Sequence, residues 1–152
     1  MTTLAFGRDQ EVGAFVGRLL RREIVLPFTA IGVEEQGRLV GGAVFNGFTG
    51  PDIELSMAGF RCWRRGVFRG LAHYVFIQLQ CKRCSITVRA SDSYTLRIAR
   101  RCGFRIEGVK RAGFGDQDAI ILGMLAEECP WLSVSPRQAT FDIGHRGEME
   151  TI

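Results

Sequence analysis

Hydrophobic and polar positions in the first part of the chain predict a helix followed by two strands. Apolar residues at positions 12, 15, 16, 19 and 20 fall on one side of a helix, which is expected to have its cap at Asp9 and to end near Arg22. Strands are predicted at about Thr29–Glu34 and Leu39–Phe45, and the turn at Gln36-Gly37 makes them an antiparallel hairpin. The glycine pair at 41–42 predicts a close backbone approach or a bulge.

The stretch from Asp52 to Phe76 combines a strand pattern with a helix pattern. Apolar positions 53, 55 and 57 alternate with polar positions 52, 54 and 56, which predicts a strand, Ile53–Gly59, with two unlike faces. A loop rich in arginine and glycine follows. Apolar residues then recur every four positions from Val67 to Leu79, so an amphipathic helix is predicted over about Gly66–Gln80.

The next stretch repeats the sequence of strand, loop and helix. Period-two alternation predicts a strand at Cys84–Ala90, and a strand–helix–strand unit of this kind is a right-handed parallel crossover. A helix is expected to begin at a cap at Ser91 or Asp92 and to stop at Gly103, because glycine is the usual residue after a helix C-terminus.

A final hairpin pairs Phe104–Val109 with Ala119–Leu125, so the predicted fold is α/β with a mixed sheet and flanking helices. The chain has 152 residues, which suffices for one compact domain, expected over residues 1–132. The polar residues 133–152 are expected to be a loosely attached tail. The sequence is 46% apolar and 24% charged and shows no membrane-length apolar run and no signal peptide. The protein is therefore expected in the cytoplasm, without a membrane partner.

Basic residues are concentrated in one part of the chain. Residues 61–111 hold 13 Lys and Arg against two acids, a net charge of +11, whereas the remainder carries −7. All but Lys82 and Lys110 of the 20 basic residues are arginines, and the guanidinium group suits bidentate recognition of phosphate. Such a region can serve a nucleic acid, an anionic cofactor or an acidic partner, and charge alone leaves these three open.

The five cysteines are expected to be reduced thiols, because their number is odd and no export signal precedes them. Cys81 and Cys84 match the C-x-x-C spacing of zinc and redox sites. However, a structural zinc site needs four ligands, and a thioredoxin-like motif opens a helix. This pair lies where a helix ends and a strand begins, so the two residues are expected to be packing residues, and no metal site is predicted.

The loop between the third strand and its helix has the composition of a phosphate site. The N–H groups and the positive dipole end of a helix N-terminus attract anions. Gly66 opens the helix, and Arg64, Arg65 and Arg69 lie beside it. This loop is therefore the candidate site for the pyrophosphate of a nucleotide-containing cofactor.

Three stretches form a combined pattern: the strand, loop and helix from Glu54 to Phe76, the helix from Asp92 that ends in Gly-Phe, and the hairpin that begins Gly-Phe-Arg-Ile-Glu-Gly at Gly103. The pattern, over about Ala30–Trp131, resembles the GCN5-related N-acetyltransferase (GNAT) superfamily. Its spacing is most similar to the ribosomal-protein N-terminal acetyltransferase branch and to phage-encoded relatives. The resemblance implies a splayed parallel strand pair in the sheet, acetyl-CoA as cofactor and an amine as acetyl acceptor.

The resemblance also implies roles for individual residues. Glu54 would be the general base that takes a proton from the attacking amine, with an exposed or ion-paired glutamate as the alternative. The backbone N–H groups of Met57, Ala58 and Gly59 would hold pantetheine and polarise the thioester carbonyl. The cofactor-binding loop would comprise Arg64, Arg65, Gly66, Val67, Phe68, Arg69 and Gly70.

Four positions depart from the family pattern. Trp63 and Phe68 replace a polar and a small residue of the pyrophosphate loop. Asp92 replaces the asparagine that opens the last helix and touches pantetheine. Ala99 replaces the tyrosine that often protonates the leaving thiolate. The family's first strand is expected to be shortened or absent before the first helix.

The expected function is transfer of an acetyl group from acetyl-CoA to a primary amine by direct attack. Tyr94 is a candidate substitute acid, with a surface tyrosine as the alternative, and Asp92 and Arg101 are candidate cofactor contacts. The alternative function is a non-catalytic GNAT-like module that binds CoA or another anionic partner, which Phe68, Asp92 and Ala99 favour. A protein N-terminus, a polyamine-like amine and an antibiotic stay open as acceptors, as does a homodimer. Nucleic acid is not expected, because no strand interleaves aromatic residues for base stacking.

Overall fold

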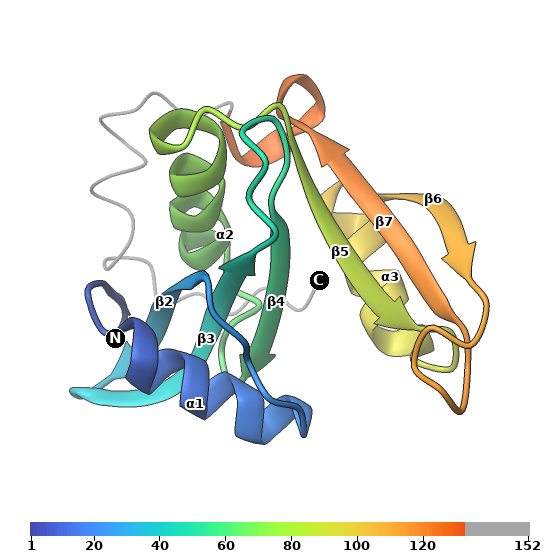
Figure 1. Cartoon of the computed structure of the whole chain (residues 1–152). Coiled ribbons are helices and arrows are strands. Elements are labelled where there is room, and N and C mark those ends of the chain that lie inside the picture. Colours follow the sequence, from blue (N-terminus) through green and yellow to red (C-terminus); the bar gives the residue numbers. More distant parts are fainter. Residues whose placement is uncertain (133–152) are drawn as a thin grey trace.

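The computed structural model describes residues 1–132, which form a seven-stranded mixed sheet with helices on both faces (Figure 1). The predicted tail, residues 133–152, lies outside the described residues. The strands are β1 Thr2–Ala5, β2 Phe28–Glu35, β3 Arg38–Asn46, β4 Glu54–Gly59, β5 Arg83–Arg89, β6 Arg105–Lys110 and β7 Ala119–Leu125, in the spatial order β1-β2-β3-β4-β5-β7-β6. The helices are α1 Asp9–Leu20, α2 Arg65–Ala72, which continues as the π-helical turn η1 His73–Gln78, and α3 Ser93–Cys102, followed by the 3-10 turns Ala126–Glu128 and Pro130–Leu132.

The predicted order of elements and the α/β class with a mixed sheet are confirmed. β2 and β3 form an antiparallel hairpin, β4 and β5 are parallel neighbours, and β6 and β7 form the last hairpin. The observed element ends lie within two residues of the predicted ones. The periodicity of the sequence therefore places every predicted element correctly.

The N-terminal region confirms one expectation and corrects another. The strand before the first helix is shortened, one of the two expected outcomes: β1 has four residues and pairs antiparallel with β2. Asp9 is the first residue of α1 and not its cap, which is Arg8 and makes no side-chain cap hydrogen bond. Asp9 Oδ1 instead accepts a hydrogen bond from the Ala30 N–H at 3.1 Å, so this carboxylate ties the helix to β2.

Helix α1 covers one face of the sheet. Val12 and Val16 are fully buried and pack against Ala30 on β2 and Val44 on β3. A Cβ at Gly42 would lie 2.7 Å from Val12, closer than carbon atoms approach in packed interiors. The absence of a side chain at Gly42 thus lets α1 lie directly on β3.

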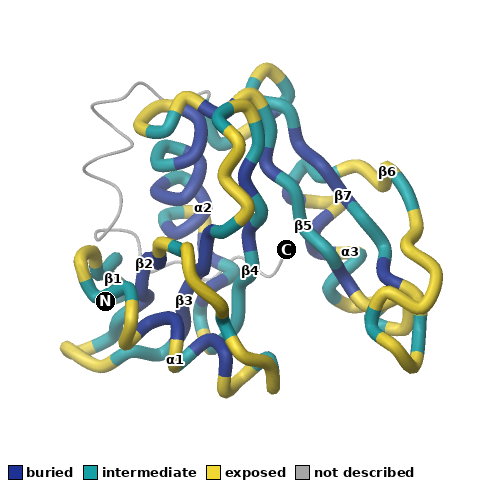
Figure 2. Tube along the Cα trace, in the orientation of Figure 1, coloured by how far each residue is buried: buried dark blue, intermediate teal, exposed yellow. Residues whose placement is uncertain are grey.

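Helices α2 and α3 cover the opposite face. Phe45, the neighbour of Val44 on β3, packs into the cluster formed with α2, and α3 packs on β5 and β7 through Ala99. The buried positions follow the inner side of α2 and the central strands, whereas β6 at the sheet edge is exposed (Figure 2). Because side chains alternate along a strand, β3 presents Val44 to α1 and Phe45 to α2.

The glycine pair of β3 marks both a close approach and a bulge, as predicted. The register between β2 and β3 shifts between Val33 and Glu34, opposite this region of β3. A Cβ at Gly41 would overlap Cys62 Sγ and would lie 3.1 Å from the Ala58 carbonyl oxygen. The start of the arginine-bearing loop therefore packs directly on the β3 backbone.

Replacing Gly41 with alanine should consequently destabilise the protein. Cys62 is fully buried, so neither its sulfur nor the adjacent backbone can move aside freely, and overpacking of this kind costs roughly 1–3 kcal/mol. The measurement is urea denaturation of the parent and of Gly41→Ala. Gly108→Ala is the matched control, because a Cβ at Gly108 on β6 would meet nothing within 4 Å. Equal denaturation midpoints for the two variants would contradict this packing.

Candidate active site

Strands β4 and β5 are paired at one point and then diverge (Figure 1). The bridge joins Glu54 to Ser85, and the Ser85 N–H donates to the Ile53 carbonyl oxygen at 2.9 Å. β4 is paired with β3 along its length, and β5 is paired with β7. Both strands are thus held on their outer sides while their facing edges separate, so the splayed parallel pair that the family resemblance implied is present.

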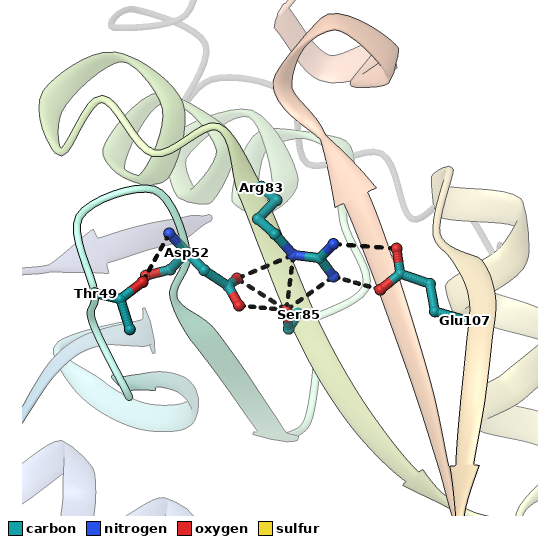
Figure 3. Close-up of polar contacts among 5 residues, drawn as sticks. All are labelled: Thr49, Asp52, Arg83, Ser85 and Glu107. Atoms are coloured by element: carbon teal, nitrogen blue, oxygen red, sulfur yellow. Dashed lines mark hydrogen bonds and ion pairs between the residues drawn. The ribbon is translucent and has the colours of Figure 1, made fainter.

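A polar network holds the end where the two strands meet (Figure 3). Arg83 on β5 forms ion pairs with Asp52, at 3.4 Å, and with Glu107 on β6. The Ser85 hydroxyl donates to Asp52 Oδ1 at 2.8 Å, and the Asp52 N–H donates to Thr49 Oγ1 at 3.3 Å. The network joins the β3–β4 connection, β5 and β6, so the strands diverge from a fixed end.

A cavity of about 310 Å³ lies between the diverging strands. Met57, Phe68 and Trp131 contribute to its apolar wall, on the face covered by α2 and α3. Ser56 and Thr87 line it as well. Because the neighbours Ser56 and Met57 point to opposite faces of β4 and both line the cavity, the cavity reaches both faces of the sheet.

Glu54 lies at the closed end of the splay, on the same face of β4 as Ser56. It is partly buried, and its Oε1 accepts a hydrogen bond from Thr87 Oγ1 at 3.2 Å. Thr87 lines the cavity, whereas Glu54 does not. Within residues 1–132 Glu54 makes no ion pair. The carboxylate is therefore held beside the cavity by the hydroxyl of Thr87.

Met57, Ala58 and Gly59 form the open end of β4. All three pair in register with β3, with Met57 opposite Ala43 and Gly59 opposite Gly41. Backbone N–H groups of a strand alternate between its two neighbours. Since β5 pairs with β4 only at Glu54, N–H groups of this segment that point away from β3 face the cavity side without a strand partner.

The candidate phosphate loop places the N-terminus of α2 next to the cavity. Not all arginines of the loop point to the cavity. α2 begins at Arg65, so the N–H groups of Arg65, Gly66 and Val67 belong to its first turn. Arg64 is the N-cap and is buried, with 4% of its surface exposed. Its guanidinium donates to Thr2 Oγ1 at 2.8 Å and lies 3.8 Å from Glu35. Arg64 is thus engaged with β1 and β2, and Arg69 and Gly70 continue the helix.

Phe68 points inward from the same helix turn. It is buried, and its ring lies 6.1 Å from Trp63 and 5.1 Å from Trp131, measured between ring centroids. All three aromatic rings line the cavity. Trp131 is fixed by a hydrogen bond from its Nε1 to the Cys102 carbonyl oxygen at 3.0 Å. Phe68 therefore forms part of the cavity wall and leaves the cavity open.

Helix α3 and its cap carry four residues considered in the sequence analysis, and two of them lie at the cavity. Asp92 is the cap, which decides between the two predicted caps, and its Oδ1 accepts from the Thr95 N–H at 3.0 Å. Asp92 and Ala99 both line the cavity. Tyr94, with 52% of its surface exposed, and Arg101, also exposed, do not. The structure thus brings Asp92 and Ala99 together with Met57 and leaves the other two outside.

All five cysteines are free and buried. Burial raises the pKa of the Cys62 thiol to about 11 and that of Cys102 to about 12. Burial likewise raises the pKa values of Cys81, Cys84 and Cys129. Among residues 1–132 no group of His, Cys, Asp and Glu side chains could hold a metal ion. The C-x-x-C pair joins the main core cluster, so its members pack as predicted.

Acidic residues from outside the basic region compensate part of its charge. Arg61 pairs with Glu35 at 2.9 Å and Arg89 pairs with Asp116 at 3.1 Å. Arg83 and Arg64 are engaged by acids in the same way. The net charge of the segment therefore overstates the positive charge available to a partner.

Several cavity residues escaped the sequence analysis. On β5, the polar residues Thr87 and Arg89 line the cavity and alternate with apolar ones, and the predicted parallel pairing could have placed this strand beside Glu54. Arg22 carries no such signal. Its guanidinium donates to Ser56 Oγ, 34 positions further along the chain, and this contact depends on how α1 lies on the sheet.

The splayed parallel pair, the cavity that crosses the sheet and the helix N-terminus beside it together define the GNAT fold, as predicted. No protein-family model matches the chain, and no curated protein matches it. Among solved structures, the dodecameric spermidine N-acetyltransferase from Vibrio cholerae superposes with a TM-score of 0.71 at 16% identity, covering 88% of this chain and 98% of that one. A mutant of that enzyme gives a TM-score of 0.70 at 15% identity, with coverages of 87% and 96%. A chimera of the Vibrio cholerae enzyme with hSSAT gives 0.67 at 16%, with coverages of 83% and 96%. These likenesses establish the fold.

The described part of the chain, residues 1–132, contains no helix with the length and apolar character needed to span a bilayer.

The buried thiols should make the protein resistant to thiol reagents and sensitive to alkali. A folded-state pKa raised above the unfolded value of about 8.5 leaves stability intact below that pH. At higher pH the unfolded thiols ionise first, so the free energy of unfolding falls as pH rises from about 8.5 towards 11. Urea denaturation at pH 7.5, 8.5 and 9.5 measures this effect, and Cys62→Ala should show a shallower fall.

Ellman's reagent at pH 8 gives an independent check on burial. The native protein should react slowly, and all five thiols should react once guanidinium unfolds the chain. Rapid labelling of native Cys102 or Cys129, located by mass spectrometry, would show that the cavity wall admits the reagent and would contradict their burial.

Proposed function

We propose that this protein is an N-acetyltransferase that moves an acetyl group from acetyl-CoA to a primary amine by direct attack. The observation that carries the proposal is the cavity that crosses the sheet between β4 and β5, with a carboxylate at its edge. A thioester can enter from the face of α2 and α3, while the amine approaches from the face of α1. Two reactants held on opposite sides of one opening meet without a covalent enzyme intermediate.

The residues of β4 supply the chemistry of transfer. Glu54 takes a proton from the attacking amine, directly or through a water molecule. N–H groups of Met57–Gly59 that point away from β3 bind pantetheine and stabilise the oxyanion that forms on the thioester carbonyl. The free cysteine thiol has a pKa of about 8.5. The thiol of CoA is of similar acidity, so it leaves as a thiolate without the tyrosine that Ala99 replaces.

Acetyl-CoA fits the wall on which α2 and α3 lie. The N–H groups of Arg65, Gly66 and Val67 at the start of α2 receive the pyrophosphate, and the helix dipole adds to the attraction. Arg69 and, from α3, Arg101 supply further positive charge for the cofactor's phosphates. Because Arg64 is engaged with Thr2 and Glu35, it acts by fixing the loop. When bound, the cofactor supplies the acetyl thioester.

Two classes of amine are candidates for the acetyl acceptor. The sequence resembles most the branch that acetylates the N-termini of ribosomal proteins, which favours a peptide amine. The solved structures of the same fold are named for spermidine. The two acceptor classes differ in charge, and the charges around the cavity bear on that choice.

Replacing Glu54 with glutamine should lower kcat by about 10²- to 10⁴-fold, the usual contribution of a general base. The amide oxygen still accepts the hydrogen bond from Thr87, so the geometry of β4 and β5 is preserved. Thiol release from acetyl-CoA across a panel of amines measures the effect. Glu127→Gln is the control, because Glu127 is exposed and lies outside the cavity lining. Unchanged turnover in Glu54→Gln would refute the role of the base.

Replacing Gly66 with proline should weaken CoA binding about tenfold to a hundredfold, because it removes one N–H donor to an anion. Proline is tolerated in the first turn of a helix. Gly66→Ala is the matched control, since it keeps the N–H. Calorimetry with CoA and with pantetheine, which lacks the diphosphate, measures the loss, which should be confined to CoA.

Calorimetry with CoA, combined with the thiol-release assay, distinguishes an enzyme from a binding module. CoA binding together with thiol release in the presence of an amine supports the transferase. CoA binding without thiol release across the whole amine panel would instead support the non-catalytic module.

A further inference from the structure

The end of α1 delivers two arginines to the mouth of the cavity on the face opposite α2. Arg21 is the C-cap of α1 and adopts a left-handed conformation, with φ of 53°. The chain turns there, and Arg21 and Arg22 both line the cavity. Arg22 reaches β4, where its guanidinium donates to the hydroxyl of Ser56. Ser56 shares its strand face with Glu54, the proposed base.

The charges that line the cavity are predominantly positive. They are Arg21, Arg22 and Arg89 against the single carboxylate of Asp92. Arg89 is paired with Asp116, and Asp92 is occupied in capping α3. Within residues 1–132, Arg21 and Arg22 have no ion-pair partner, and the hydroxyl that Arg22 contacts is neutral. Their positive charge is therefore available to whatever enters the cavity from this face.

The position of Arg22 makes it unsuited to the pyrophosphate of the cofactor. The loop proposed for the pyrophosphate begins beyond Gly59, at the far end of β4. Ser56 is three residues earlier, about 10 Å along a strand. Moreover, α1 and α2 lie on opposite faces of the sheet. Arg22 therefore faces the side from which the acceptor amine would approach.

We propose that the acceptor is an amine that also carries a carboxylate, and that Arg22 binds this carboxylate and so selects the acceptor. This inference rests on the proposed function. Ser56 lies two residues from Glu54, about 7 Å along the strand. If the amine of the acceptor lies beside Glu54, a carboxylate of the same molecule can reach Arg22 when several bonds separate the amine from the carboxylate. The side chain of an N-terminal Asp or Glu has this spacing, and so has a small ω-amino acid.

A polyamine fits this surface poorly. Its additional ammonium groups would lie against Arg21 and Arg22, and like charges at short range repel. The chain is thus expected to differ in acceptor from the spermidine N-acetyltransferases whose fold it shares. Shared fold and different acceptor are compatible, because the acceptor is chosen by side chains at the site.

The test compares acceptors of different charge with the full-length protein and acetyl-CoA. The panel contains a peptide that begins with Glu, the same peptide beginning with Ala, 4-aminobutyrate and spermidine, with kcat/KM measured by thiol release. The Glu-first peptide should exceed the Ala-first peptide and spermidine by about tenfold or more, the value of one charge-assisted hydrogen bond. Activity with 4-aminobutyrate in addition would point to small molecules, and its absence to a peptide N-terminus.

Variants of Arg22 then assign the selectivity to this residue. Arg22→Glu should lose about tenfold to a hundredfold on the Glu-first peptide and little on spermidine, whereas Arg22→Lys should keep the order of acceptors. Arg18→Glu is the matched control, because Arg18 is exposed on the same helix and does not line the cavity. Thermal melting of each variant checks that the fold is retained.

The results separate this inference from the proposed function. Acetylation of spermidine as fast as of the Glu-first peptide, or an equal loss on all acceptors in Arg22→Glu, would overturn the selection by Arg22 and leave the transferase intact. Absence of thiol release with every amine would refute the transferase. In that case fluorescence anisotropy with a labelled Glu-first peptide still decides: binding that is lost in Arg22→Glu supports recognition of the carboxylate, and binding that is equal in both overturns it.

Discussion

The departure of β5 from β4 after a single bridge is the feature on which the site depends. A parallel pair normally satisfies its backbone groups along its whole length, and here the pairing stops after Glu54 and Ser85. The divergence is sustained because each strand has a full antiparallel partner on its other side, and because Arg83, Asp52 and Glu107 fix the end where the strands meet. The opening is thus held by strand pairing on both outer sides and by one polar network at the closed end.

The opening joins two chemically different surfaces. Toward α2 and α3 it is walled by Met57, Phe68 and Trp131, an apolar and largely aromatic surface suited to an extended apolar chain. Toward α1 it presents hydroxyl groups and arginines. Alternation of side chains along β4 produces this difference within two consecutive residues, Ser56 and Met57. The proposed reaction between a thioester and an amine would use this division, because a base must reach the amine while the thioester is kept from water.

The distribution of charge is decided by pairing and not by composition. The segment from residue 61 to residue 111 is strongly basic, yet Arg61, Arg64, Arg83 and Arg89 are engaged by carboxylates, several of them from acidic parts of the chain. Arg21 and Arg22 lie outside that segment and have no ion-pair partner within residues 1–132. The positive charge offered to a ligand at the mouth of the cavity therefore comes in part from residues that a count along the sequence would pass over.

The sequence by itself determined the elements, their order and the mixed sheet, because helix and strand periodicities and the glycine after α3 are local properties of the chain. It also indicated the loop before α2 and a cap at Ser91 or Asp92 through their positions beside those elements, and the family resemblance indicated Glu54. Only the tertiary structure decided which of these residues meet. It directed Asp9 to β2 and Arg64 to Thr2 and Glu35, left Tyr94 and Arg101 outside the cavity, and brought Arg22 to Ser56. Such contacts depend on the angle at which each helix lies on the sheet. That angle is set by the packing of residues distant in sequence, such as Val12 on Gly42. Periodicity along the chain therefore does not predict it.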